Sequence, residues 1–389
     1  MGDTRRPVVA LVSDAIYPYF RGGKEIRYRE VADRLARCAD VHVFTMKWWA
    51  GPTVRRDGKV TFHAVSRLRE MYSGQRRSYR EALFFALSCL RLLWFRFDAL
   101  EADQFPNFHI LTLRLVTWLK RKPLYVTWHE VWGPEYWREY LGVAGNMAWL
   151  VEWLSMRAPD HLFAASPQTA ERLREILGDR TSITVAPNGI DLESIQSCWP
   201  DAERADIVTV GRFLPHKNME MLLESVAMLH AAGLQVTCRI IGDGPQREHL
   251  RERASQLGIE SAVDFRHDVW EQKDVFGLIK ASRVAVFPTS REGFGIAVLE
   301  ALACGVPVVT TSAPDNLARH LVDRSATGVV CAPSAAAIAE ALRPILEKNQ
   351  DKTPREPAAP EPWLADYGWD AVTDQIARVL LAHVGSAAP

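Results

Sequence analysis

The stretch that decides the fold is Val284-Ala-Val-Phe-Pro288-Thr-Ser-Arg-Glu-Gly-Phe-Gly-Ile-Ala-Val-Leu-Glu300, an apolar strand that runs through a glycine loop into a helix. Gly293 and Gly295 remove side chains from the loop, so free amides at the positive end of the helix can face a phosphate or a carboxylate. Glu292 in the loop and Glu300 inside the helix can then accept hydrogen bonds from the hydroxyls of a polyhydroxylated ligand. Taken alone, such a pair is better explained as a helix-dipole acid beside a surface glutamate.

Apolar runs of this kind recur along the chain, each followed by a helix-like pattern. They occupy residues 8–13, 41–45, 124–128, 207–210, 237–241, 284–288 and 306–310. Short, nearly continuous apolar strands that alternate with amphipathic helices are typical of parallel sheets covered on both faces. Two such series in 389 residues predict an α/β protein with two Rossmann-like, doubly wound domains.

The domain boundary is predicted between residues 188 and 204, where turn residues and an acidic stretch lack periodicity. The predicted domains are residues 1–188 and residues 204–362. Residues 349–362 contain four prolines and five charged residues, which predicts an exposed connector. Apolar positions from 363 to 381 predict a helix, and the segment 363–389 is expected to return toward the N-terminal domain.

Composition limits the possible partners and the compartment. The chain has 47 Lys and Arg residues and 47 Asp and Glu residues, so no polyanionic partner such as a nucleic acid is expected. A hydrophobic fraction of 48% and a mean hydropathy of −0.10 indicate a globular protein. Six cysteines lie far apart without a C-x-x-C pair, which favours a reducing, cytoplasmic setting. The most hydrophobic stretch, residues 82–97, is too short to cross a bilayer.

Two further loops follow predicted strands in the second half of the chain. Gly211-Arg212-Phe-Leu-Pro-His-Lys217 presents a guanidinium and, five residues later, an ammonium. This pair suits a diphosphate because arginine binds two oxygens at once while lysine acts as a point charge; two solvated surface cations are the simpler alternative. In Gly242-Asp-Gly244-Pro245, the glycines either let the backbone approach a planar group or only form a tight turn.

Together these motifs resemble those of the bacterial family-4 glycosyltransferases, a retaining group in which two Rossmann-like domains face each other across a cleft (GT-B). The segment from Glu292 to Glu300 is similar to the Glu-x7-Glu signature of that group. Each motif is weak singly, and their joint specificity is high because they occur in order along almost the whole chain. The other matching motifs are Gly22-Gly-Lys-Glu25, Pro187-Asn-Gly-Ile-Asp191, Val210-Gly-Arg212 with Lys217-Asn218, and Ile241-Gly-Asp-Gly-Pro245.

The resemblance implies roles in binding a nucleotide sugar. Arg212 and Lys217 would hold the donor diphosphate. Glu292 would bind hydroxyls of the donor sugar, and Glu300 would bind the ribose hydroxyls. The residues expected to bind the donor are Gly22, Gly23, Gly211, Arg212, Lys217, Gly242, Gly244, Val269, Glu292, Gly293, Phe294, Gly295, Ile296, Leu299 and Glu300.

The resemblance also implies roles at other positions. Gly22 and Gly23 would let the backbone of the first domain approach the phosphates. The loop with Val269 and Trp270 would face the nucleobase. His129 would bond the transferred sugar, although a lone histidine at a strand end is often structural. The expected catalytic residues are His129, Arg212, Lys217 and Glu292.

The implied reaction moves a sugar from a nucleoside-diphosphate sugar to an acceptor hydroxyl with retention of configuration. Fixed cations beside the leaving phosphate supply the main electrostatic help, and no metal ion is expected. The nucleotide sugar is a co-substrate, and no other cofactor is expected. A UDP-linked donor is favoured, while guanosine and thymidine donors stay open. Glu292 is expected to bind the sugar rather than to act as the nucleophile of a retaining hydrolase.

The acceptor is expected on the first domain, and the nucleotide sugar on the second. Trp132 lies in an aromatic and acidic stretch, residues 128–140, where aromatic faces can pack on sugar rings. Glu130 and Glu135 can pair with ammonium groups. These residues predict a small polyhydroxylated or amino-sugar acceptor, such as an aminocyclitol precursor of a natural product. Aromatic core packing beside ordinary helix acids explains the same pattern.

A second acceptor hypothesis comes from residues 55–96, which contain ten Lys and Arg residues and three acids. Basic residues beside aromatic ones can rest weakly on an anionic membrane and admit a lipid-linked acceptor of glycan assembly. A solvated basic loop is the simpler alternative. Two other function classes stay open: a nucleotide-sugar-binding protein without turnover, and a nucleotide-sugar epimerase of the same architecture.

Overall fold

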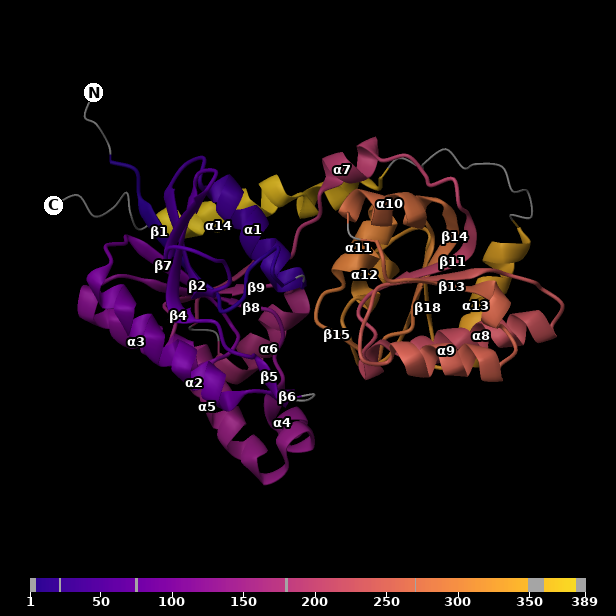
Figure 1. The fold of residues 1–389 in the computed structure, drawn as a ribbon, viewed down its shortest axis with the longest axis horizontal. Coiled ribbons are helices and arrows are strands. Elements are labelled where there is room, and N and C mark those ends of the chain that lie inside the picture. Colours follow the sequence, from indigo (N-terminus) through magenta and orange to yellow (C-terminus); the bar gives the residue numbers. More distant parts are fainter. Residues whose placement is uncertain are drawn as a thin grey trace. The chain divides into compact units, whose positions relative to one another are not determined.

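The computed structural model describes residues 5–20, 22–73, 76–178, 181–269, 271–348 and 360–382. The chain divides into two compact units. The first contains Met1–Gly189 together with Trp369–Pro389, and the second contains Ile190–Gly368. Each unit is an α/β structure built around its own sheet (Figure 1).

The first unit contains a large sheet whose neighbouring strands are parallel, except for the antiparallel pair β3 and β4. Every residue of β1, β7 and β8 is buried, as expected for strands covered on both faces. The strand order is β10 (Ile183–Val185), β9 (His161–Ala164), β8 (Leu124–Trp128), β7 (Ala99–Asp103), β1 (Val8–Val12), β2 (Asp40–Lys47), β4 (Val60–Arg67) and β3 (Val54–Asp57).

Helices cover both faces of this sheet (Figure 1). On one face, α1 (Gly23–Leu35) and α14 (Trp369–Ala382) pack over Val9 and Leu11 of β1. The other face is covered by α2 (Tyr79–Ser88), the 3-10 helix η1 (Cys89–Trp94), α3 (Phe108–Lys120), α5 (Gly145–Arg157) and α6 (Pro167–Leu177). The remaining short elements are β5 (Tyr72–Ser73), β6 (Arg76–Arg77), α4 (Gly133–Leu141), which packs on α5, and η2 (Gly142–Ala144).

The second unit contains a fully parallel sheet. Its strand order is β13 (Val263–Arg266), β12 (Cys238–Ile241), β11 (Ala205–Val210), β14 (Ser282–Phe287), β16 (Val308–Thr311) and β18 (Gly328–Cys331). A separate two-stranded sheet joins β15 (Arg291–Glu292) to β17 (Asp315–Asn316).

Two helical layers cover this sheet as well. One layer contains α7 (Leu192–Ser197), α10 (Gln272–Lys280), α11 (Ile296–Ala303), α12 (Arg319–Arg324) and the 3-10 helix η5 (Pro362–Tyr367). The other contains α8 (Met219–Ala231), α9 (Arg247–Gln256) and α13 (Ala335–Glu347). Two short 3-10 helices complete the unit, η3 (Pro215–Lys217) and η4 (Glu260–Ala262).

The prediction of two Rossmann-like, doubly wound domains is confirmed. Some boundaries differ from the predicted ones. Residues 190–203, which include α7, belong to the second unit. The helix predicted over 363–381 starts at Trp369, because the residues before it form η5 and Gly368 leaves the helical conformation. The predicted connector lies mostly in 349–359, outside the described residues.

Each sheet has a point where the strand order reverses. In the first unit the chain builds outward from β1 to β2 and then returns to β7 on the other side of β1. In the second unit it builds from β11 to β13 and returns to β14. Ligands of open α/β sheets bind beyond the carboxyl ends of the strands at such switch points. None of the helices in the described part of the chain is long and apolar enough to cross a membrane.

Candidate functional site

On the second unit, the loop after β11 is tied to the loop after β14 at the switch point. The amide of Ser290 donates to the carbonyl oxygen of His216 at 2.9 Å, and the Thr289 hydroxyl donates to the same oxygen at 3.0 Å. The backbone therefore joins the predicted phosphate-binding loop to the predicted sugar-binding loop, although 73 residues separate Thr289 from His216 in the sequence.

Lys217 and Glu292, two of the predicted catalytic residues, form an ion pair between Nζ and Oε2. Both side chains are 24% exposed, so a ligand can reach them. The backbone of Glu292 is fixed by the pairing of β15 with β17, and its carbonyl oxygen accepts a hydrogen bond from the amide of Leu317 at 2.8 Å. The structure thus holds the two charged groups side by side, with the backbone of Glu292 fixed by its neighbours.

Arg212 is exposed at the same edge of the sheet. Partial burial lowers the pKa of His216 to about 4, and the charges of Lys217, Arg291 and Arg212 add to this effect while Glu292 opposes it. Arg212 is therefore within electrostatic reach of the same imidazole as Lys217 and Glu292. This arrangement concentrates positive charge at the switch point.

Gly295 is the N-cap of α11 and has a φ of 93°, in the left-handed region. A β-carbon at this position would lie 2.5 Å from the β-carbon of Ala318, so both the conformation and the close approach require glycine. Gly293 lies in the same loop, and Ile296 opens the helix. The first amides of α11 lack partners within the helix and are suited to binding an anion.

Two other predicted donor residues of this segment have a packing role. Leu299 is fully buried in the apolar core of the unit, and Phe294 is 6% exposed. The Phe294 ring lies 5.9 Å from the ring of Tyr367. Contact of either side chain with a donor stays a prediction.

Glu300 lies inside α11 and is 7% exposed. Burial raises the pKa of its carboxyl to about 7, although Oε1 accepts a hydrogen bond from Gln272 Nε2 at 2.6 Å. Gln272 begins α10, three residues after the half-buried Val269. The structure therefore brings Glu300 to the end of the loop predicted to face the nucleobase. Trp270, in the same loop, lies outside the described residues.

The glycines of the loops after β11 and β12 allow these loops to pack closely together. A β-carbon on Gly242 would collide with the carbonyl oxygen of Gly211, and one on Gly244 would lie 2.7 Å from the backbone of Phe213. The amide of Phe213 donates to the carbonyl oxygen of Asp243 at 3.0 Å. This packing already requires small residues there, so the predicted contact of Gly211, Gly242 and Gly244 with the donor stays a prediction.

On the first unit, a charged cluster lies at the switch point between β1 and β7. Lys24 Nζ lies 2.6 Å from Asp103 Oδ2 and 2.9 Å from Asp14 Oδ1, and both carboxylates are completely buried. His129 Nε2 lies 3.4 Å from Asp103 Oδ1. Burial alone raises the pKa of Asp103, but Lys24 and His129 outweigh it and hold this pKa well below its usual range. His129, which the sequence predicts as a catalytic residue, thus belongs to a cluster of charged side chains together with Asp103, Lys24 and Asp14.

No role is predicted from the sequence for Asp14, Lys24, Asp103 or Gln104. Gln104 Oε1 accepts hydrogen bonds from the amides of His129 at 2.8 Å and Glu130 at 3.2 Å. The signal in the sequence was Gln104 directly after a short segment that contains apolar residues. The acidic residues Glu101 and Asp103 make this segment hard to recognise as a buried strand. Gln104 is therefore a positioning residue for the backbone that carries His129.

Gly22 and Gly23 lie at the start of α1, where Gly22 is the N-cap. A β-carbon on Gly22 would collide with the carboxylate of Glu25. These glycines place Lys24 in the first turn of α1, next to Asp14. Their predicted approach to phosphates stays a prediction.

The predicted acceptor residues fall into different environments. The Trp132 indole donates to Glu130 Oε2 at 3.2 Å, so Glu130 already has a partner. Trp132 is half-buried among aromatic rings, and its ring centre lies 5.1 Å from that of Phe105. Glu135 is exposed in the first turn of α4. The structure therefore joins Glu130 to Trp132, and no contact of Glu135 with them is recorded among the described residues.

Within the described ranges, no group of three or more His, Cys, Asp or Glu side chains is arranged to hold a metal ion. Asp243 accepts a hydrogen bond from the amide of Gly244 at 2.9 Å. Independence from metal stays a prediction.

Comparison with known proteins identifies the class to which these two units belong. Residues 21–194 match the family described as Glycosyltransferase Family 4, and residues 195–359 match the family described as Glycosyl transferases group 1. Two doubly wound sheets with these matches define a GT-B glycosyltransferase. The chain belongs to the family-4 glycosyltransferases, as the resemblance predicts.

Individual relatives are distant. Glycogen synthase from Mycobacterium tuberculosis is 29% identical over 249 residues, which cover 62% of this chain and 58% of that protein. The chain thus spans less than two thirds of the length of such curated relatives. Sucrose-phosphate synthase from Thermosynechococcus elongatus has a TM-score of 0.78 and 19% identity, covering 98% of this chain and 100% of that one. Anabaena HepE in complex with UDP and glucose has a TM-score of 0.69 and 18% identity, covering 97% and 100%. These two structures show the fold alone.

Proposed function

We propose that this protein transfers a sugar from a nucleoside-diphosphate sugar to an acceptor hydroxyl, without a metal ion and with retention of configuration. The donor binds to the second unit and the acceptor to the first. A UDP-linked donor is supported by the fold neighbour HepE, whose structure contains UDP and glucose. The six cysteines, none of them in a disulfide, suit the reducing conditions of the cytoplasm.

The observation that carries this proposal is the charged group at the switch point of the second sheet. Lys217 is paired with Glu292, and the charge of Arg212 acts on His216, the imidazole that Lys217 and Glu292 also influence. Cleavage of the bond between sugar and phosphate develops negative charge on the diphosphate, which preorganised cations stabilise. A bound diphosphate replaces Glu292 as the partner of the Lys217 ammonium. Glu292 is then able to accept hydrogen bonds from sugar hydroxyls.

Retention follows if the acceptor hydroxyl attacks the anomeric carbon on the face from which the phosphate departs. The bond from the acceptor oxygen forms, the bond to the phosphate oxygen breaks, and that phosphate oxygen takes the proton. Glu292 then binds the sugar and forms no covalent bond to it. Trapping of a covalent sugar on Glu292 with a fluorinated donor would contradict this assignment.

The test removes both cations in the double variant R212A/K217A. Each charge-assisted hydrogen bond contributes about 1.5–3 kcal/mol, so UDP binding is expected to weaken at least about 100-fold. Titration calorimetry with EDTA present measures this affinity and shows at the same time whether UDP binding needs a metal ion. The matched control R343A/K348A removes two exposed charges from the end of α13 and is expected to bind UDP as the unaltered protein does. Unchanged affinity in R212A/K217A would refute the proposal.

A second candidate function, transfer to an acceptor at a membrane surface, is favoured by the outer face of α2, η1, α3 and α5. The acids of these elements, Glu81 and Glu152, are both buried, while their exposed charges are basic. Exposed apolar residues on elements whose exposed charges are basic suit an anionic lipid surface. The exposed apolar residues of this face are Tyr79, Leu83, Leu87, Trp94, Leu115, Trp118, Leu119, Met147, Leu150 and Leu154.

Co-sedimentation with vesicles tests this candidate. The protein is expected to bind phosphatidylglycerol vesicles and not phosphatidylcholine vesicles. The variant W118E, on α3, should lower the bound fraction about tenfold because it removes an apolar contact and adds a like charge. W199E replaces a tryptophan that is 84% exposed on the second unit, and it should leave binding unchanged. Equal binding to both vesicle types would exclude this role.

A further inference from the structure

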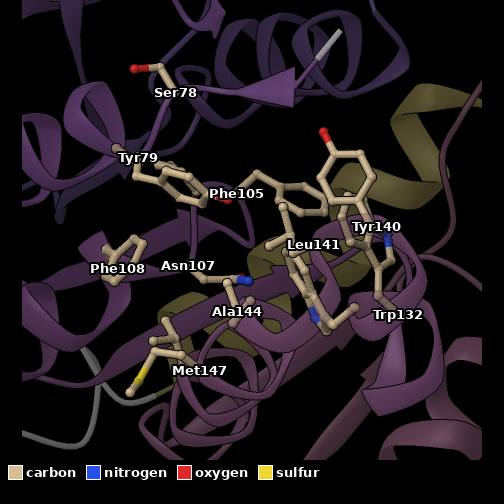
Figure 2. Close-up of a pocket in the computed structure, with 15 residues that line it drawn as sticks. Ser78, Tyr79, Phe105, Asn107, Phe108, Trp132, Tyr140, Leu141, Ala144 and Met147 are labelled. Carbon is tan, nitrogen blue, oxygen red and sulfur yellow. The ribbon is translucent and has the colours of Figure 1, made fainter.

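A pocket in the first unit lies between α2, the start of α3, α4 and α5 (Figure 2). Its volume is about 220 Å³, and apolar and aromatic side chains make up most of its lining. The rings of Tyr79, Phe105 and Phe108 and the side chains of Leu141 and Met147 surround the space in Figure 2. Such a lining contrasts with the polar surroundings that a polyhydroxylated ligand requires.

The aromatic residues on one wall of the pocket are held in place by hydrogen bonds to a buried carboxylate. Glu152 is completely buried, and its Oε1 accepts a hydrogen bond from the amide of Trp132 at 3.1 Å. Its Oε2 accepts one from the indole of Trp137 at 2.6 Å. The ring centres of Trp132 and Trp137 lie 4.7 Å apart. The pocket is therefore largely preformed, because the buried carboxylate fixes the Trp137 ring and the backbone of Trp132.

Asn107 adds a polar group to this apolar lining. The residue is 5% exposed, and its Oδ1 has no hydrogen-bond partner in the part of the chain that the structure describes. Figure 2 shows the amide nitrogen directed into the space between the rings. The two indole N–H groups of the pocket already donate to Glu130 and Glu152. The amide nitrogen that faces the pocket can therefore donate a hydrogen bond to a hydroxyl oxygen on a ligand.

The pocket adjoins the charged cluster of the same unit. The amide of Phe105, whose ring lines the pocket, donates to Asp103 Oδ1 at 3.4 Å. The same oxygen lies 3.4 Å from His129 Nε2. Trp132, on another wall, follows His129 by three residues. The wall of the pocket is thus connected through Asp103 to the histidine predicted to act on the sugar.

We propose that this pocket is an acceptor subsite for an otherwise apolar aromatic or alicyclic ring that carries a single hydroxyl group, packed against Phe105 and Trp132 and hydrogen-bonded to the amide nitrogen of Asn107. This inference rests on the proposed function and names its acceptor class. A cavity of 150 Å³ lined by apolar residues binds benzene, so 220 Å³ accommodates one substituted ring and not a long lipid chain. The acceptor then differs from the polyhydroxylated or amino-sugar compound that the sequence alone predicts.

The test titrates the whole protein with phenol, toluene and myo-inositol and follows binding by ligand-observed NMR. Phenol is expected to bind at least fivefold more tightly than toluene, and myo-inositol is expected not to bind. The measurement needs neither donor nor turnover. Its result is therefore independent of the UDP titration of R212A/K217A, and failure of one is distinguishable from failure of the other.

Three variants locate the binding. A148F fills the pocket from α5 and is expected to lower phenol affinity at least tenfold. The matched control L150F, on the same helix but outside the pocket, should leave it unchanged. N107G removes the amide while tolerating the φ of 49° at this position, and it should abolish the preference for phenol over toluene. Melting curves check that each variant folds, and N107G tests the site if A148F does not.

Two outcomes would overturn the inference. One is binding of myo-inositol that A148F or N107G removes, since it would make the pocket a polyol site. The other is phenol binding that is absent or is unaffected by both variants.

Discussion

Glu300 illustrates how burial at a single residue couples ligand binding to pH. Its pKa is raised to about 7 by burial, so the carboxyl is partly protonated near neutral pH. Ribose hydroxyls would donate to the ionised form and favour it. Affinity for UDP is therefore expected to rise about tenfold between pH 6 and pH 8. Titration calorimetry across this range measures the effect.

The variant E300Q is the control for that measurement, because it keeps an acceptor oxygen and cannot titrate. Its UDP affinity should be lower at pH 8 and should follow only the titration of the nucleotide itself. The unliganded protein supplies a second readout. A carboxyl with a raised pKa in the folded state contributes stability at low pH that is lost as pH rises from about 4.5 to 7, by up to about 3 kcal/mol. If UDP affinity changed with pH in the same way in the unaltered protein and in E300Q, the ribose role of Glu300 would be contradicted.

Residue roles differ in how far the sequence alone can predict them. Lys217 and Glu292 lie in motifs whose residue types suggest phosphate and hydroxyl binding, and the structure pairs them. The cluster of Lys24 with Asp14 and Asp103 depends on contacts between residues up to 79 positions apart. No local pattern records such a contact. Only the arrangement of β1 beside β7 brings these charges together.

At the level of elements, the central strands are the most predictable part of the fold. Strands such as β8 and β14 are buried on both faces and therefore read as continuous apolar runs. β7 is equally buried, but its sequence is not a continuous apolar run. Its Glu101 accepts hydrogen bonds from Tyr28 at 2.8 Å and Thr127 at 2.6 Å. A buried acid is tolerated there because neighbouring elements satisfy it, which the sequence of β7 does not reveal.

The glycine motifs are easy to recognise in the sequence, but the sequence does not show why glycine is needed there. Gly242 and Gly244 are recognisable in the sequence as a special turn, and the close packing of two loops explains why no side chain fits there. The motif alone does not distinguish this packing from approach to a ligand. The acceptor pocket has a similar ambiguity, since residues 128–140 predict either core packing or sugar contact. The structure adds the cavity and its apolar lining.

At the scale of the whole molecule, the first unit is discontinuous in sequence. The chain leaves this unit after Gly189 and re-enters it at Trp369. A β-carbon on Gly189 would lie 2.5 Å from the Trp369 ring, so the glycine allows close packing where the two segments meet. Arg27 is buried nearby and donates to the carbonyl oxygen of Pro187 at 2.5 Å and to Asn188 Oδ1 at 3.3 Å. The Pro-Asn-Gly motif thus has a structural role within this unit.

The C-terminal helix should accordingly be essential to the first unit and dispensable for the second. Trp369, Val372, Ile376 and Leu380 of α14 are each at most 3% exposed. Burial of such side chains contributes about 1.5–3 kcal/mol apiece, which together approaches the whole stability of a typical domain. A chain ending at Gly368 is therefore expected to lose one calorimetric unfolding transition and keep the other, together with UDP binding. A chain ending at Ala382 retains the helix and should keep both transitions. Two unshifted transitions in the shorter chain would show that the first unit folds without α14.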